Sequence, residues 1–342
     1  MTTIEIVELM EGMEAEYEEF LHGYDQALLY YSVKYKRFLT DLLGCRASYW
    51  IAVRASKIFG VLPMMAREGR WGTVWNSLPY FGSHGGVIAQ EPLVVEALYK
   101  RYSAVVGARE VAAATVVTNP FAPSYESLIA FDTSDQRLGQ VVRLEALGGS
   151  SPEEFWATVE ASARRNIKKA LASGVTVRID NGAMSFLEAC HRENMAAIGG
   201  KAKSPPFFRL IPKHFTAGKD YNIYVAEVGG TTVAALLLFY YNKTVEYFTP
   251  VVSANYRSFQ PMALIIYTAM PEAARLGYVR WNWGGTWLSQ TGLYRFKKKW
   301  NTAERPYKYY TKVNNQDLFR LTKAELMETY EGFYVLPLDA MR

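Results

Sequence analysis

The chain has 342 residues, of which 50% are apolar and 21% are charged, as is typical of a folded globular protein. Because a single hydrophobic core rarely grows beyond about 250–300 residues, this length favours two domains. The formal net charge of +5 is only mildly positive, so the chain does not have the strongly basic composition that is typical of nucleic-acid-binding proteins.

Other protein classes are excluded by local features. The longest apolar run, 233–241, is far shorter than the roughly 20 residues of a membrane-spanning helix. The N-terminus lacks the basic and apolar regions of a secretory signal. Cys45 and Cys190 give neither a disulfide framework nor the spacing of a metal site. We therefore expect a cytoplasmic protein with no integral membrane segment, no bound metal and no resident cofactor.

The first half predicts strands, then a helix, then a strand. Helical and strand-like periodicities are separated by turn residues, among them the glycine-rich stretch 82–86. The predicted elements are a helix at 26–43, strands at 48–55, 57–65 and 71–78, a helix at 91–107 and a strand at 110–118.

The second half begins with a strong helix signal at 150–174. Ser151 is a good N-cap, Pro152 suits the first helical position, and Glu154 completes a capping box. Apolar residues recur every four positions, and Gly174 is a natural stop. One continuous helix is expected here.

The rest of the second half predicts a helix at 184–198 and antiparallel hairpins. Two-residue turns at 229–230 and 242–243 separate strand-like runs, a spacing typical of hairpins. A helix at 260–277 follows, in which Pro271 is expected to cause a kink or to mark a shift in the first part of the helix. The predicted strands are 175–179, 221–228, 231–241, 244–252 and 278–283.

The two halves share one order of elements without obvious residue identity. We therefore predict a duplicated α/β fold joined near 133–150, where the pattern breaks. The predicted domains are 1–145 and 146–320, with the active cleft in the second, followed by a C-terminal tail at 321–342.

Several segments of the chain resemble one known family. The segments, in chain order, are 77-SLPYFGSHGG-86, 164-RRNIKKALASGV-175, 255-NYRSFQPMALIIYTAMPEAARLGY-278, 281-WNWGG-285 and 292-GLYRFKKKW-300. Together they are similar to motifs of the FemABX-type transferases, over roughly residues 48–310. The resemblance implies an α/β (α+β) fold of two tandem GNAT-like domains, each a mixed, mostly antiparallel sheet flanked by helices.

The resemblance also implies a reaction. It is transfer of an aminoacyl or acyl group to a primary amine, with aminoacyl-tRNA or a CoA thioester as the donor and often a cell-envelope precursor peptide as the acceptor. The expected partners are the acceptor end of a tRNA and an amine-bearing substrate. Peripheral contact with a membrane is compatible with this expectation. The coiled-coil arm of some members is absent, since no long heptad insertion interrupts the second half.

The cationic, aromatic run near the C-terminus is the predicted catalytic segment. An amine that attacks a carbonyl needs positioning and a cation or N–H groups near the oxyanion, and no covalent enzyme intermediate. The resemblance places Phe296 and Lys297 at the active cleft. By this resemblance, Lys297 is expected to stabilise the oxyanion or the phosphate end of the donor, and Phe296 is expected to pack against a donor base or sugar. Lys298 is either a phosphate contact or a solvated neighbour.

Candidate donor contacts lie at two helix ends. Tyr256 and Arg257 occupy the place of the CoA loop of an ordinary GNAT protein, but no glycine lies between Asn255 and Pro271, which favours aminoacyl-tRNA over CoA. The alternative for this pair is a plain helix-capping turn. Arg164 and Arg165 either balance a helix dipole or form a phosphate-binding patch.

Candidate acceptor contacts are spread over both halves. Lys201 and Lys203 lie in a loop that either forms the rim of the acceptor cleft or has no such role. His84 is an acceptor contact or a proton relay. Asn282, beside Trp283, replaces an acidic residue common in the family, and Glu246 on a neighbouring strand is the substitute base. Two readings compete with this one: a CoA-dependent N-acyltransferase acting on an amino sugar or amino-acid-like metabolite, and a basic-cleft binding protein without activity.

Overall fold

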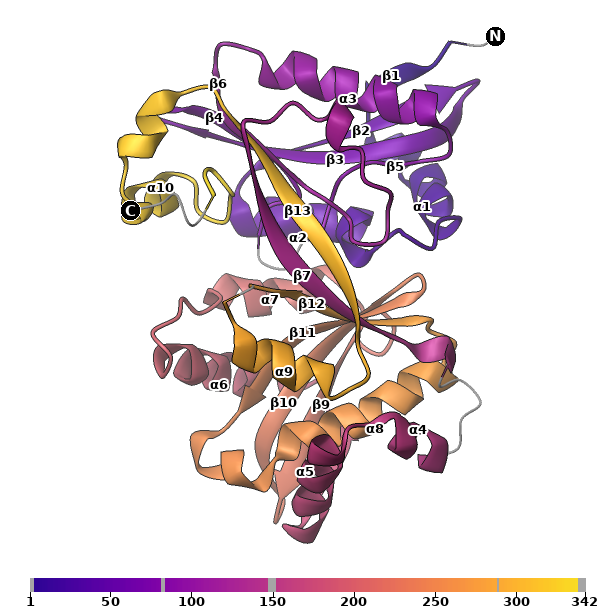
Figure 1. Ribbon diagram of the computed structural model, residues 1–342, viewed down its shortest axis with the longest axis vertical. Coiled ribbons are helices and arrows are strands. Elements are labelled where there is room, and N and C mark those ends of the chain that lie inside the picture. The colour runs from indigo at the N-terminus through magenta and orange to yellow at the C-terminus, as the bar shows by residue number, and fades with distance from the viewer. Residues whose placement is uncertain (1–2, 81–83, 147–151, 288, 338–342) are drawn as a thin grey trace. The chain divides into compact units, whose positions relative to one another are not determined.

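The computed structural model describes residues 3–80, 84–146, 152–287 and 289–337, and the chain divides into two compact units (Figure 1). The first unit comprises Met1–Arg137 with Pro306–Arg342, and the second comprises Leu138–Arg305. Each unit is a mixed, mostly antiparallel sheet with helices on its faces, as the resemblance implies.

The sheet of the first unit has one parallel pair among antiparallel neighbours. Its strand order is β1-β2-β3-β4-β6-β13, with the short β5 paired to β3. Among the described residues of this sheet, only β4 and β6 run parallel, and helix α3 (Pro92–Val106) makes the crossover that a parallel connection requires. The strands are β1 (Glu5–Glu8), β2 (Arg46–Arg54), β3 (Lys57–Gly69), β4 (Gly72–Ser77), β5 (Ile88–Ala89), β6 (Val111–Val117) and β13 (Ala303–Val313).

Helices cover both faces of this first sheet. The apolar side of α3, including Val94, Leu98 and Tyr102, packs on strand residues such as Trp50 and Trp75. Helices α1 (Glu14–His22) and α2 (Val33–Leu43) contact β3 and β2, respectively. The short helix α10 (Lys323–Thr329) follows β13 and begins with a capping box between Thr322 and Glu325.

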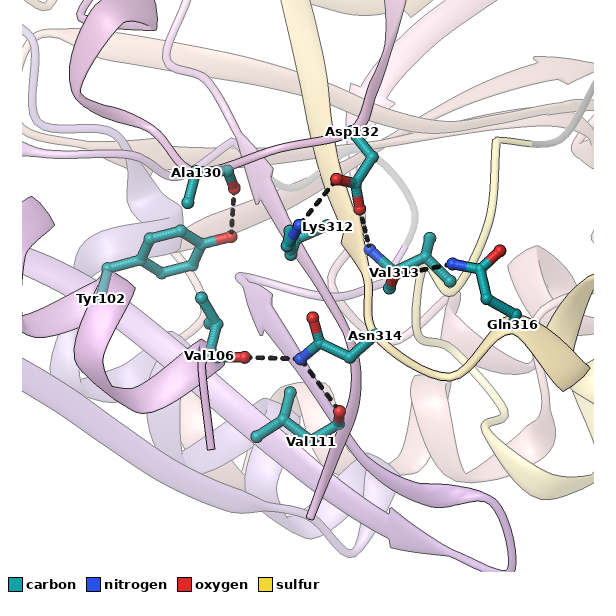
Figure 2. A network of polar contacts seen from close by, with 9 residues as sticks. All are labelled: Tyr102, Val106, Val111, Ala130, Asp132, Lys312, Val313, Asn314 and Gln316. Carbon is teal, nitrogen blue, oxygen red and sulfur yellow. Dashed lines mark hydrogen bonds and ion pairs between the residues drawn. The ribbon is translucent and has the colours of Figure 1, made fainter. Parts of the chain in front are cut away.

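The end of β13 is fixed to the first unit by polar side chains (Figure 2). Asp132 accepts the backbone N–H of Val313 at 2.8 Å and forms an ion pair with Lys312 at 2.7 Å. The Asn314 amide donates to the carbonyls of Val106 and Val111, at the end of α3 and the start of β6. These bonds explain how a strand from the far end of the sequence is held in the first sheet.

The second unit repeats the same order of elements. Its strand order is β8-β9-β10-β11-β12-β7, and in the part that the structure describes one pair, β11 and β12, is parallel. The crossover helix is α8 (Pro261–Arg275), which corresponds to α3. The strands are β7 (Thr133–Arg143), β8 (Val175–Ile179), β9 (Tyr221–Val228), β10 (Thr231–Tyr241), β11 (Thr244–Val252) and β12 (Arg280–Thr286).

The two faces of the second sheet carry different helices. Helices α5 (Ala161–Ala172) and α8 share one apolar core with the strands. Helices α6 (Met184–Ala196) and α7 (Pro205–His214) lie over the opposite face, where Phe207 of α7 stacks on Phe248 of β11. The predicted hairpin turns are confirmed, with Gly229, Gly230 and Asn242 all at positive φ.

The units exchange one strand each. β7 follows β6 in the chain but pairs with β12, and β13 follows β12 but pairs with β6. The compact units therefore differ from the predicted domains. Residues 306–320, predicted in the second domain, belong to the first unit together with 321–342. Residues 138–145, predicted in the first domain, belong to the second unit. Because of this exchange the first unit consists of two separate ranges of the sequence, so a single boundary does not divide the two units.

Some predicted elements are wrong in detail. The single helix at 150–174 is broken into α4 (Pro152–Thr158) and α5, because Glu160 is extended (φ −59°, ψ 146°) and its N–H donates to the Lys299 carbonyl at 2.9 Å. Ser151, the expected N-cap, lies outside the described residues. The loop in which Lys201 and Lys203 were expected ends at Pro205, where α7 begins. The predicted helix at 260–277 is confirmed as α8, and Pro271 lies inside it.

The core of the second unit gives a stability prediction. Ile265 of α8 is fully buried, so Ile265→Ala leaves a cavity and is expected to lower the free energy of unfolding by about 2–5 kcal/mol. Leu276, just after the same helix, is 55% exposed, and Leu276→Ala is expected to change that free energy by less than about 0.5 kcal/mol. Urea unfolding of both variants measures the difference, and equal effects would contradict the assigned core face.

Candidate active site

The parallel pair in the second unit ends early. β11 and β12 pair at Thr244 with Arg280, Val245 with Trp281, and Glu246 with Asn282. Both strands continue beyond that point, to Val252 and Thr286, without further pairing to each other among the described residues. The two strands therefore part after Glu246 and Asn282.

Buried polar side chains begin at the point of parting. The Asn282 amide donates to Glu246 Oε2 at 2.9 Å, and Asn282 Oδ1 accepts the N–H of Gly284 at 3.0 Å. Glu246 and Asn282 are each 1% exposed. Gly284 has φ +70°, a conformation that favours glycine, and the β12–β7 register shifts between Asn282 and Gly285. The Asn282 side chain thus satisfies an amide at an irregular point of the strand.

Lys297 bonds to the carbonyl of Gly284, whose N–H is bonded by Asn282. Helix α9 (Thr291–Lys298) directs its ammonium to three oxygens: the carbonyls of Gly284 (3.4 Å) and Gly285 (3.2 Å), and Thr286 Oγ1 (2.8 Å). The side chain is 3% exposed, and burial lowers its pKa to about 7. Desolvation disfavours the charged form of a lysine, so this shift follows from the site's low exposure.

The network extends into β7. Thr286 Oγ1 lies 3.4 Å from Gln140 Oε1, and Gln140 Nε2 donates to Thr302 Oγ1 at 3.2 Å. We name the connected groups of Glu246, Asn282, Gly284, Lys297, Thr286 and Gln140 the polar chain. Gly284 and Gly285 are half-buried, whereas the side chains of the polar chain are buried, so the accessible part is glycine backbone.

The aromatic residues of the predicted site lie on the core side. Trp283 is 2% exposed and packs against Tyr247, Phe296 and Trp300, so its ring is not placed to contact an acceptor. Phe296 is half-buried, with its ring edge-on to Trp283 at 6.0 Å. It therefore supports α9, which carries Lys297, and keeps part of its surface accessible.

Lys203 lies on the same face of the sheet as Glu246. Phe239, the partner of Glu246 in the β10–β11 register, contacts Phe248, and Lys203 Nζ lies 5.5 Å from the centre of the Phe248 ring. The ammonium is also 5.5 Å from the Phe207 ring, in a cation–π arrangement. Burial lowers the pKa of Lys203 to about 8. The structure thus brings Lys203, Glu246 and Asn282 to one face.

The candidate donor residues also lie close together in the fold. Tyr256 and Arg257 belong to the 3₁₀ helix η5 (Ala254–Phe259), which contacts α5, the helix that carries Arg164 and Arg165. Arg257 and Arg165 are exposed, and Arg164 is half-buried. In η5, the N–H groups of Tyr256 and Gln260 donate to carbonyls within the turn. Those two amides are therefore not available to a pyrophosphate.

Three candidates are not members of the polar chain. His84 belongs to the first unit, where it is buried between Tyr30 and Tyr307, and burial lowers its pKa to about 3. Lys201 is exposed. Lys298 forms a surface ion pair with Glu304 at 3.6 Å.

Sequence reasoning did not find Thr286, Gln140 or Asn194. The Asn194 side chain of α6 bonds both backbone groups of Val252 at the end of β11, at 3.0 and 3.1 Å. None of the three stands in a motif, and their partners lie 11 to 146 positions away. Only the pair Gly284–Gly285 signalled an irregular backbone here.

Two kinds of feature are absent from the described residues. They contain no helix long and apolar enough to cross a membrane. They also contain no group of three or more His, Cys, Asp or Glu side chains arranged to hold a metal ion.

Comparisons with known proteins agree with this geometry. Residues 158–298, which include η5, α8, β12 and α9, match the model of the acetyltransferase (GNAT) domain. A crystal structure of FemX is similar with a TM-score of 0.70 and 14% identity, covering 92% of this chain and 99% of that one. This chain has the tandem GNAT fold of FemX. The resemblance to FemABX-type transferases is confirmed at the level of the fold, and the domain match makes the chain an enzyme of the acyltransferase class.

Two further solved structures share this fold. The C-terminal domain (DUF2156) of a putative lysylphosphatidylglycerol synthetase from Agrobacterium fabrum has a TM-score of 0.60 and 12% identity, covering 95% of this chain and 99% of that one. A tandem GNAT protein from the clavulanic acid biosynthesis pathway has a TM-score of 0.53 and 8% identity, covering 91% and 98%. A search of curated proteins found no match.

Burial of Lys297 predicts a pH dependence of stability. Its folded pKa of about 7 lies below the ordinary 10.5, so between these values the unfolded chain binds more protons and folding becomes more favourable as pH rises. The destabilisation is complete below about pH 7 and is lost by about pH 10.5. We expect the unfolding free energy of the wild type, minus that of Lys297→Met, to rise by up to about 1.4 kcal/mol per pH unit. Urea unfolding from pH 7 to 9.5 measures it, and a flat difference would contradict the shift.

Proposed function

We propose that the chain transfers an aminoacyl or acyl group from an activated donor to a primary amine, at the place where β11 and β12 part. The observation that carries this proposal is the buried Lys297 ammonium beneath the half-buried backbone of Gly284 and Gly285. A desolvated cation next to accessible backbone is the kind of group that stabilises negative charge developing on a carbonyl oxygen.

Lys297 has a donor that can be redirected. An ammonium has three N–H donors, and here three oxygens accept from it. The bond to the Gly284 carbonyl, at 3.4 Å, is the longest, so this donor is the one most easily turned to a substrate oxygen. In the proposed reaction the donor carbonyl lies over Gly284–Gly285, and Lys297 stabilises the oxyanion as the amine attacks.

Glu246 is the proposed proton acceptor. The acceptor amine must lose a proton to attack and complete the transfer, and Glu246 is the carboxylate of the polar chain. Asn282 orients it through one oxygen, at the end of the paired register. Lys203, on the same face, would contact an anionic group of the acceptor.

Aminoacyl-tRNA is the proposed donor. In the turn before α8, the backbone amides of Tyr256 and Gln260 already donate to carbonyls of the turn. Gln260 has the left-handed (αL) conformation at a place where close approach to a pyrophosphate favours glycine. Arg257, Arg164 and Arg165 instead offer separate cations for a phosphate backbone. A cytoplasmic location, where aminoacyl-tRNA is present, belongs to the same proposal, as does an acceptor of the cell-envelope precursor kind.

A CoA thioester is the alternative donor. It is favoured by the acetyltransferase domain match, because the matched residues include η5 and the N-terminus of α8. Donor discrimination decides between the two. The purified protein is incubated with labelled aminoacyl-tRNA or labelled acetyl-CoA and a panel of amines, and transfer of label to an amine is measured. We expect label to move from the tRNA and calorimetry to show no low-micromolar site for acetyl-CoA. Transfer from acetyl-CoA with tight binding would establish the alternative.

The role of Lys297 gives a rate prediction. Lys297→Met keeps much of the aliphatic stem and removes the charge, so the rate at saturating substrates is expected to fall on the order of 10²–10³-fold, as for the loss of one oxyanion donor. Acceptor affinity is expected to change little, because the interaction strengthens in the transition state. Single-turnover transfer of labelled donor measures both quantities.

The matched control is Lys299→Met, which removes the same charge two residues away. Lys299 is half-buried, and no side-chain bond to the polar chain is present. We expect a far smaller change in rate. If both variants weaken donor binding in parallel, with a shallower salt dependence, the run is a phosphate-binding patch. If no donor is ever turned over and only binding responds, the chain is a basic binding protein and the proposed activity is wrong.

A further inference from the structure

The two units carry corresponding polar pairs. β4 and β6 of the first unit are the counterparts of β11 and β12, since each pair is parallel and joined by a crossover helix. Near the end of its register, Asn76 lies opposite Thr115 in the first unit, as Glu246 lies opposite Asn282 in the second. The four side chains are buried.

In the first unit, the C-terminal segment Gly332–Leu336 covers the polar pair. The backbone N–H of Tyr334 donates to Asn76 Oδ1 at 2.6 Å, and its carbonyl accepts from Asn76 Nδ2 at 2.8 Å and from Thr115 Oγ1 at 3.3 Å. Asn76 therefore bonds both backbone groups of one residue, as a neighbouring strand would.

Side chains of the segment are also held individually. The Tyr334 hydroxyl donates to the Tyr80 carbonyl at 2.8 Å, and its ring lies edge-on to Tyr309 at 4.8 Å. The Gly332 carbonyl accepts the N–H of Tyr80 at 2.8 Å. Phe333, Val335 and Leu336 are buried. Backbone bonds together with pockets for side chains are the usual means of recognising an extended peptide.

The bonds described for the corresponding pair of the second unit lie within its strands. There, Asn282 bonds Glu246 and the N–H of Gly284, both within the strands themselves. The same place in the repeated fold thus holds a chain segment in the first unit, whereas groups of the strands take the side-chain bonds of Asn282 in the second.

We propose that the first unit is a binding site for an extended, tyrosine-containing peptide, and that the chain's own Gly332–Leu336 segment occupies it in cis and exchanges with free peptide of the same kind. Asn76 and Thr115 recognise the peptide backbone, and Tyr80 and Tyr309 recognise the tyrosine. This site is separate from the transfer chemistry and does not depend on it.

The test uses the full chain with a protease site inserted between Leu321 and Thr322, in the connection from η6 (Gln316–Arg320) to α10. After cleavage, a fluorescent peptide of residues 322–342 is added, and its binding is followed by anisotropy. The control peptide carries N-methyl-tyrosine at position 334, which removes the N–H that Asn76 accepts. We expect saturable binding, competition by unlabelled peptide, and binding at least about tenfold weaker for the methylated peptide.

Three outcomes would overturn the proposal. Unfolding on cleavage, seen by circular dichroism, would make the segment an inseparable part of the core. A cut fragment that stays bound and never exchanges would do the same. Equal affinity of the methylated peptide would show that Asn76 does not recognise the backbone.

A second readout uses the uncut chain. In Asn76→Ala, hydrogen exchange at the Tyr334 amide is expected to accelerate at least about tenfold, because its acceptor is removed. The Val313 amide, which Asp132 accepts at 2.8 Å, is the internal reference and is expected to be unchanged. An unchanged Tyr334 amide would contradict the proposed recognition.

Discussion

The site in the second unit depends on the parting of β11 and β12 after three paired residues. If the parallel register continued, the backbone groups of β12 beyond Asn282 would bond to β11 and would be closed to a substrate. Instead, the Asn282 side chain takes the Gly284 N–H, and the Lys297 ammonium takes the carbonyls of Gly284 and Gly285. These side chains satisfy the groups that the neighbouring strand would otherwise satisfy, and so hold the two strands apart.

Two features of this arrangement are unfavourable for the stability of the fold. An ammonium without a carboxylate among its hydrogen-bond partners is unfavourable in a buried place, and this burial lowers the pKa of Lys297. Gly284, at φ +70°, is also a position where other residues are strained. Departures from the best local choice concentrate at functional sites, which supports a role in chemistry for a lysine that a leucine or methionine would replace more stably.

Much of the fold follows from local sequence patterns. The turns at 229–230 and 242–243 specify two hairpins, and the spacing of apolar residues specifies α5 and α8. The exchange of β7 and β13 does not follow, because each strand takes a partner far away in the sequence. The break at Glu160 likewise depends on a bond to Lys299, which local propensity cannot reveal.

The site was predictable only in part. The motif around Phe296 and Lys297 distinguished one lysine from its neighbours, and the structure buries that lysine while Lys298 pairs at the surface. Composition alone would have treated the three lysines alike. Trp283 was placed among acceptor contacts, although its ring belongs to the core. Gln140 and Thr286 became visible only when the sheet aligned their strands.

The pKa of the Lys297 ammonium decides whether the polar chain contains a buried, desolvated cation. It can be measured by NMR titration of the protein carrying ¹³Cε-labelled lysine, with the signal assigned by its loss in Lys297→Met. A midpoint near 7 is the predicted result. A midpoint near the ordinary lysine value of about 10.4 would contradict it, because an ammonium that titrates normally is solvated and does not hold the strands apart.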